Sequence, residues 1–226
     1  MRAWIPKFSV LVGASIAAAC GARPELSPAP GAQPAPAGPG RGAMATTAGV
    51  TVIARTDAWS GVPRRLDDVT PVLVTIENEG DSPIRLRYDR FALLAPTGER
   101  YAAIPPFDVR GTEVEPLSQY DLDGFYVAPH LARYYPWLRP YRGYFPYDGL
   151  YYDTYYPQFL RIRLPTGDMI QKALPEGVLS PGGRITGFLY FENPDGDTPR
   201  VNFTFEMVDA ESERTVGVVA IPFIVD

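Results

Sequence analysis

The chain has 226 residues, of which 46% are hydrophobic, and it carries a formal net charge of −5 at pH 7. This length fits one domain with appendages, and the apolar content is sufficient for a buried core. The acidic balance argues against sequence-independent binding of nucleic acid, because such binding needs a basic surface that displaces counterions from phosphates. We therefore expect no nucleic-acid partner.

The N-terminus has the layout of a secretory signal. Arg2 and Lys7 precede an apolar run that ends in three alanines and the only cysteine of the chain, Cys20. The run covers about ten residues, which is half of the roughly 20 that a membrane-spanning helix needs. Residues 1–19 are therefore predicted to be a cleavable signal peptide rather than a transmembrane anchor.

The sequence Ala17-Ala18-Ala19-Cys20 resembles the lipobox of bacterial lipoproteins. The resemblance implies that the Cys20 thiol carries a diacylglyceryl group and that Cys20 becomes the new N-terminus. A lone cysteine has no intrachain disulfide partner, which agrees with this use of the thiol. Gly21-Ala22 lacks the aspartate that retains many such proteins at the inner membrane, so the resemblance implies a cell-envelope location at the outer membrane. The alternative is an ordinary signal peptide cleaved after Ala19.

A segment rich in Pro, Gly and Ala follows the cysteine. Between residues 20 and 49, Leu26 and Met44 are the only bulky apolar residues. Such a composition does not offset the conformational entropy that ordering removes. We expect a disordered linker with a reach of at most roughly 90 Å, at about 3.1 Å per residue, which holds the domain away from the lipid surface.

From residue 50 onward, apolar and polar residues alternate with the period of a β-strand. The apolar positions of the clearest strands are Val72, Val74 and Ile76; Ile84, Leu86 and Tyr88; Leu160, Ile162 and Leu164; and Val201, Phe203, Phe205 and Met207. Turn sequences rich in Gly, Pro, Asp and Asn separate these strands, and about nine strands fit the segment. Residues 50–226 are therefore predicted to form one all-β domain, an antiparallel sandwich.

One short helix interrupts the strands. Residues 167–174 have Thr166 as an N-cap and Pro175 as a stop, which predicts one or two helical turns. The stretches 73–84 (LVTIENEGDSPI) and 172–191 (KALPEGVLSPGGRITGFLYF) resemble exported bacterial immunoglobulin-like domains of poorly known function. The resemblance implies an immunoglobulin-like β-sandwich and transfers no functional residue.

A long insert, residues 105–158, breaks the strand pattern. It contains 11 of the 14 tyrosines of the chain. A long connection without regular structure is usually functional or disordered, and the aromatic content argues against disorder. Tyrosine buries an apolar face while its hydroxyl stays hydrated, as in binding loops. The predicted contact residues are Tyr134, Tyr135, Trp137, Tyr141, Tyr144, Tyr151 and Tyr152. The alternative is that these rings only pack the insert onto the sandwich.

The sequence contains no catalytic or cofactor motif. The only histidine, His130, lacks a Gly-x-Ser-x-Gly motif for a catalytic triad, and with one cysteine it cannot supply the usual zinc ligands. Phosphate loops and dinucleotide fingerprints are absent. The segment Asn193–Asp197 has oxygen ligands like a calcium loop, but Thr198 and Thr204 stand where an EF-hand requires Gly and Glu, which favours a tight turn. We expect no enzyme activity, no metal and no cofactor.

The expected function is that of a cell-envelope lipoprotein acting as a non-enzymatic interaction or structural module. Its partners would be the membrane, through the lipid anchor, and a protein or an envelope glycan, through the insert. The alternative is a glycan-binding protein whose rings stack on sugars. A glycosidase ranks lower; its carboxylate pair would combine Asp121 or Asp123 with Asp148 or Asp153.

Overall fold

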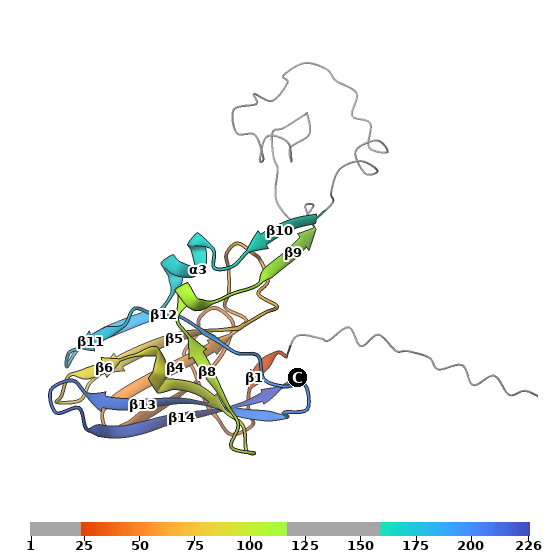
Figure 1. Cartoon of the computed structure of the whole chain (residues 1–226). Coiled ribbons are helices and arrows are strands. Elements are labelled where there is room, and N and C mark those ends of the chain that lie inside the picture. The colour runs from red at the N-terminus through yellow and green to blue at the C-terminus, as the bar shows by residue number, and fades with distance from the viewer. Residues whose placement is uncertain (1–23, 117–158) are drawn as a thin grey trace, which may run out of the picture.

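The computed structural model describes residues 24–116 and 159–226, and in these ranges the fold is all-β, as predicted (Figure 1). The strands are β1 (Leu26–Pro28), β2 (Gln33–Pro34), β3 (Arg41–Thr47), β4 (Val50–Thr56), β5 (Thr70–Asn78), β6 (Ile84–Leu86), β7 (Phe91–Leu94), β8 (Arg100–Ile104), β9 (Thr112–Pro116), β10 (Phe159–Arg163), β11 (Gly177–Leu179), β12 (Arg184–Phe191), β13 (Arg200–Asp209) and β14 (Thr215–Val225). Among the described residues the helical elements are the 3-10 turns η1 (Tyr88–Arg90) and η2 (Pro106–Asp108) and the α-helix α3 (Gly167–Lys172). None of the helices in these ranges is long and apolar enough to cross a membrane.

Twelve strands form one antiparallel sheet that curves almost into a barrel. The order along the sheet is β1-β14-β13-β7-β8-β12-β5-β4-β3-β2, with β6 beside β13 and β11 beside β6. Strand β8 pairs with both β7 and β12 and therefore joins the two halves of the sheet. At the opposite side β3 approaches β14, where the Thr47 hydroxyl donates to the Val218 carbonyl at 3.5 Å. We call this curved sheet the body.

The core fills the space between the two halves of the sheet. Phe91 and Phe205 stack with ring centroids 4.3 Å apart, and Phe191 meets Phe203 edge-on at 5.9 Å. The predicted alternation in β13 is confirmed, because Val201, Phe203, Phe205 and Met207 are all buried. The predicted inward positions of β5 and β6 are buried as well. The register of these strands follows from the polarity pattern, since a shift by one residue would turn every ring to the solvent.

The N-terminal segment closes the seam of the body. Strand β1 pairs with β14 and strand β2 pairs with β3, so residues that follow each other in the chain join the two ends of the sheet. Leu26 is only 3% exposed. The expectation that residues 20–49 are a disordered linker is therefore wrong for residues 24–49, and residues 20–23 lie outside the described ranges.

The composition of residues 24–49 suggested disorder because the apolar surface that orders this segment belongs to the strands with which it pairs. The buried side chain of Arg55 in β4 donates to the Pro36 carbonyl and so holds the loop between β2 and β3. A Cβ at Gly42 would lie 2.8 Å from Arg55 Cγ, so this close packing needs glycine. The small residues of this segment thus allow its main chain to hydrogen-bond to the neighbouring strands and to pack closely against them, and they do not cause disorder.

The predicted helix is confirmed as α3, which ends at Lys172. The Thr166 hydroxyl accepts a hydrogen bond from the Met169 N–H at 3.4 Å, as an N-cap does. Met169 is fully buried, and the Tyr190 hydroxyl donates to the Met169 carbonyl at 2.9 Å. Together with Leu66 and Val109 these residues form a second, smaller core outside the barrel.

The strand predicted around residues 160–164 exists, but it does not belong to the body. Strand β10 pairs with β9 alone, in a two-stranded sheet that projects beyond α3 (Figure 1). Leu160 and Ile162 are half-buried, and only Leu164 is fully enclosed. The first part of the expected insert, residues 105–116, therefore has regular structure of its own, namely η2 and β9. We call the β9–β10 hairpin the arm.

Candidate functional site

The predicted functional residues lie outside the described ranges. This holds for Cys20 and for the contact residues Tyr134, Tyr135, Trp137, Tyr141, Tyr144, Tyr151 and Tyr152. It holds also for His130 and for the aspartates of the glycosidase alternative, Asp121, Asp123, Asp148 and Asp153. The structure does describe the arm, whose two strands lie directly before and directly after residues 117–158 in the sequence.

The arm joins the two ends of that segment directly. Phe159 is paired with Pro116, and four further pairs follow, down to Arg163 opposite Thr112. At its base, the Leu164 N–H donates to the Gly111 carbonyl at 3.1 Å. The residues on either side of the segment 117–158, Pro116 and Phe159, are thus paired at the end of a hairpin.

Two buried glutamates attach the arm to the body. The Glu113 carboxylate accepts from the Asp67 and Asp68 N–H groups at 2.7 and 3.1 Å, and Glu115 accepts from the Arg65 N–H at 2.8 Å. Both glutamates are only 4% exposed. Burial raises the pKa of Glu113, while the hydrogen bonds from the two N–H groups act in the opposite direction.

The opposite face of the arm is apolar and cationic. Residues directly opposite in an antiparallel pair point to the same side, so Val114 shares a face with Arg161, and Phe159 with Pro116. Val114 and Phe159 are 55% and 54% exposed, and Arg161 and Arg163 are exposed beside them. We call this the outer face of the arm. It presents apolar side chains and positive charge to the solvent, and it contains no acidic residue.

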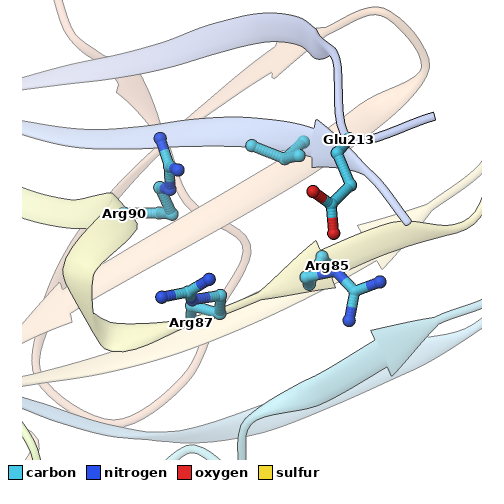
Figure 2. Close-up of a pocket in the computed structure, with 5 residues that line it drawn as sticks. Arg85, Arg87, Arg90 and Glu213 are labelled. Atoms are coloured by element: carbon cyan, nitrogen blue, oxygen red, sulfur yellow. The ribbon is translucent and has the colours of Figure 1, made fainter. Parts of the chain in front are cut away.

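A second candidate site lies on the body, around β6. Figure 2 shows Arg85, Arg87 and Arg90 with Glu213 around a small hollow of about 70 Å³. An adjoining, more open hollow of about 410 Å³ is lined by Arg85, Arg87, Glu213 and Glu176. We call these two hollows together the arginine cleft. Strand β6, turn η1, the β13–β14 turn and the approach to β11 each contribute residues to it.

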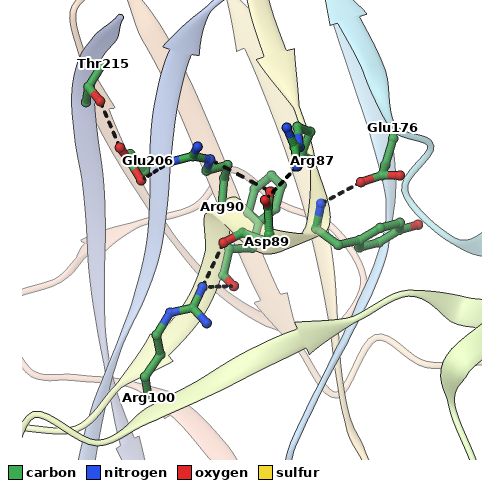
Figure 3. A network of polar contacts seen from close by, with 9 residues as sticks. Arg87, Asp89, Arg90, Arg100, Glu176, Glu206 and Thr215 are labelled. Atoms are coloured by element: carbon green, nitrogen blue, oxygen red, sulfur yellow. Dashed lines mark hydrogen bonds and ion pairs between the residues drawn. The ribbon is translucent and has the colours of Figure 1, made fainter. Parts of the chain in front are cut away.

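Acidic partners neutralise two of the three arginines (Figure 3). Arg87 pairs with Asp89 at 2.8 Å and Arg90 with Glu206 at 2.7 Å. The Glu206 carboxylate also accepts from the Thr215 hydroxyl at 2.8 Å, and this bond, followed by the one from Arg90, lowers the pKa of Glu206. Arg100 donates to the Asp89 carbonyl at 2.8 Å and so fixes the turn.

Arg85 differs from its two neighbours. Its guanidinium donates to the Ala210 carbonyl at 2.7 Å, and no carboxylate pairs with it among the described residues. The Nε–H groups of Arg85 and Arg90 are buried without a hydrogen-bond acceptor.

The other motifs of the sequence have structural roles. The segment at Asn193–Asp197 is a turn, closed by the Thr198 N–H donating to the Asp195 carbonyl at 2.9 Å, and the Asp195 N–H donates to the Tyr101 hydroxyl. Within residues 24–116 and 159–226, no group of three or more His, Cys, Asp or Glu residues could hold a metal ion.

The comparisons with known proteins add no assignment. The chain matches no protein-family model, no curated protein and no solved structure.

Sequence reasoning missed both sites for the same reason. It assigned Arg85 and Arg87 to the hydrated face of a strand, and it assigned Leu160, Ile162 and Leu164 to the sandwich. A signal for the cleft was present in three arginines within six residues, Arg85, Arg87 and Arg90. The alternation along a strand shows which of its own side chains share a face. Which residues of other strands lie next to them depends on how the strands pair, and the alternation does not show this.

Proposed function

We propose that this protein is a lipid-anchored protein of the cell envelope, at the outer membrane, that acts as a non-enzymatic interaction module. Its contact surface is the Tyr-rich segment 117–158 together with the outer face of the arm. The partner is an envelope protein. A glycan partner is the competing outcome of the experiment below.

The observation that carries the proposal is the arm itself. A segment that served only to pack the sheet edge would be expected to leave and rejoin the body at the edge strands. Here residues 117–158 instead connect Pro116 to Phe159, and these two residues form the outermost pair of the arm. Val114 and Phe159 extend the same surface with exposed apolar area, which is the chemistry found at protein contacts.

The anchor belongs to the same proposal. If Cys20 carries the lipid, only residues 21–23 separate it from the first described residue, Pro24. At most about 3.6 Å per residue, the chain from Cys20 to Pro24 reaches roughly 14 Å. The domain would then lie against the lipid surface, rather than up to 90 Å from it.

The finer fold assignment is also a proposal. We infer an immunoglobulin-like origin for the body, because two antiparallel half-sheets enclose one core in the way two sheets do in a sandwich. Strand β8, which joins the halves, would then be an elaboration of that plan.

The contact surface is tested with Tyr134→Ala/Tyr135→Ala. Under the proposal this double variant keeps the melting temperature of the parent and loses capture of a defined partner from envelope extract. Tyr190→Ala is the matched control, because Tyr190 is fully buried in the second core and its loss must lower the melting temperature.

Capture on purified cell-wall glycan, lost in the same double variant, would instead establish the glycan alternative. A lowered melting temperature with unchanged capture would show that the rings only pack, and the proposed contact surface would be wrong.

The anchor is tested separately with Cys20→Ser. A serine cannot accept the thioether-linked lipid, so the variant is expected to leave the membrane fraction and to lose the mass of the acyl groups. Unchanged membrane fractionation and an unchanged mass would refute lipidation without affecting the test of the insert.

A further inference from the structure

The arginine cleft holds positive and negative side chains that do not satisfy each other. Arg85 and Glu213 line both hollows, and no ion pair joins them among the described residues. Figure 2 shows Glu213 and Arg85 beside each other at the small hollow. Arg87 and Arg90, by contrast, are engaged by Asp89 and Glu206. One cation and one carboxylate of the cleft therefore remain available to a ligand.

Arginine side chains outnumber the single carboxylate, that of Glu213, around the smaller hollow, which suits this hollow to a ligand carboxylate. Arg85 and Arg90 both line the smaller hollow. A guanidinium also binds a planar carboxylate with two parallel hydrogen bonds. A volume of about 70 Å³ holds a group of that size and little more.

The larger hollow is lined by two carboxylates, those of Glu176 and Glu213, which suit it to an ammonium group. Glu213 lies on the exposed turn between β13 and β14, and Glu176 lies just before β11. One Glu176 oxygen accepts from the Tyr88 N–H at 2.9 Å, which orients that carboxylate. The two carboxylates disfavour a dianion such as phosphate, and Arg85, which has no acidic partner among the described residues, disfavours a simple cation. A ligand with both charges avoids both repulsions.

We propose that the arginine cleft binds a small zwitterion, namely an amino acid or a short peptide with free amino and carboxyl ends. The ligand carboxylate occupies the smaller hollow between Arg85 and Arg90. The ligand ammonium lies in the larger hollow near Glu213 and Glu176. The larger hollow, about 410 Å³, is within the size range of small-molecule sites. This inference does not depend on the proposed function, because the cleft lies on the body and not on the arm.

Titration calorimetry on the purified full chain tests this with three probes. Alanyl-alanine carries both charges, N-acetyl-alanyl-alanine lacks the ammonium group, and alanyl-alanine amide lacks the carboxylate. We expect alanyl-alanine to bind and each blocked form to bind at least about tenfold more weakly, since a charge-assisted hydrogen bond is lost each time. Equal affinity for the acetylated form would show a simple anion site, and absence of binding by all three probes would refute the proposal.

Two variants place the binding in the cleft. Glu213→Gln and Arg85→Gln are each expected to weaken alanyl-alanine by about tenfold or more. Arg184→Gln is the matched control, because Arg184 is an exposed arginine of β12 whose partner is Glu77. Unchanged affinity in both cleft variants would refute the assignment.

The same variants separate binding from folding. The Arg85 side chain also holds the β13–β14 turn through Ala210, so Arg85→Gln has a structural effect of its own. The Glu213 side chain has no hydrogen bond or ion pair among the described residues, so Glu213→Gln is expected to keep the parental melting temperature. Arg85→Lys, which keeps the charge, is expected to recover part of the affinity.

Discussion

The body and the arm are held together by different forces. In the body, aromatic and aliphatic side chains such as Phe91, Phe203 and Phe205 are removed completely from water. In the arm, the fully buried residues of the inner face are Glu113 and Glu115, beside the half-buried Leu160 and Ile162. The two carboxylates accept from main-chain N–H groups of the loop before β5. The body therefore depends on apolar burial, which is nondirectional, and the arm on a few directional hydrogen bonds.

The difference suits the two parts to different tasks. A core stabilised by many buried rings opens only at a high cost in free energy, whereas a hairpin attached mainly by hydrogen bonds to a loop can open without unfolding the sheet. The outer face of the arm leaves Val114 and Phe159 exposed. Changes in the body should therefore affect global unfolding, and changes in the arm should affect local opening.

The largest effect is expected from a core ring. Phe203→Ala removes a fully buried side chain and leaves a cavity, which should lower the free energy of unfolding by about 3–5 kcal/mol. Thr204→Ala, at the adjacent outward position, loses only one hydrogen bond, to the Ala92 carbonyl, and should cost about 1 kcal/mol or less. Urea unfolding measures both. Equal costs would contradict the register of β13.

The N-terminal segment provides the next test, because it decides how far the body extends. Leu26→Ala should lower the free energy of unfolding by about 2–5 kcal/mol, since Leu26 is enclosed where β1 closes the seam. Gln33→Ala, at an exposed position of the same segment, should have almost no effect. Should Leu26→Ala unfold at the same urea concentration as the parent, the segment would not be part of the cooperative unit.

Local patterns predicted most elements, but not how they pair. The alternation around Phe203 and the N-cap at Thr166 each determine structure within a few residues, and both predictions are confirmed. The pairing of β10 with β9 depends on residues that are distant in sequence from the sandwich strands, so Leu160 and Ile162 were given the wrong neighbours. The order of residues 24–49 arises from β4 and β14, and no property of the segment itself reveals it.

The arm is tested by changing its main acceptor. Glu113→Ala removes the acceptor of the Asp67 and Asp68 N–H groups, at a cost of about 1 kcal/mol for each hydrogen bond. Glu113→Gln keeps a carbonyl oxygen in the same place and should retain most of the stability. Amide hydrogen exchange at Asp67 and Asp68 should accelerate in the alanine variant alone, while exchange in β13 stays slow. Acceleration in β13 as well would show that arm and body unfold together.

The smallest effect, and the sharpest contrast between the two parts, is the response to pH. Burial raises the pKa of Glu113, so the attached arm binds a proton more readily than the opened arm. The free energy of opening should therefore increase as the pH falls from 7 through the raised pKa toward the ordinary value of about 4.3 for glutamate.

In the body the sign is reversed, and the pH window is lower. Hydrogen bonds from Thr215 and Arg90 lower the pKa of Glu206, and hydrogen bonds from Ser212 lower that of Asp209. Their contribution is complete above the ordinary carboxylate pKa and is lost as the pH falls through the lowered values, below about 4. Global unfolding should thus become easier only in strong acid, after the arm has reached its maximum stability. Exchange protection at Asp67 and Asp68, corrected for the intrinsic rate, should rise as the pH is lowered from 7 toward the ordinary pKa of glutamate in the parent and stay level in Glu113→Gln. Protection that falls over this range in the parent would show that the ionised carboxylate is what holds the arm.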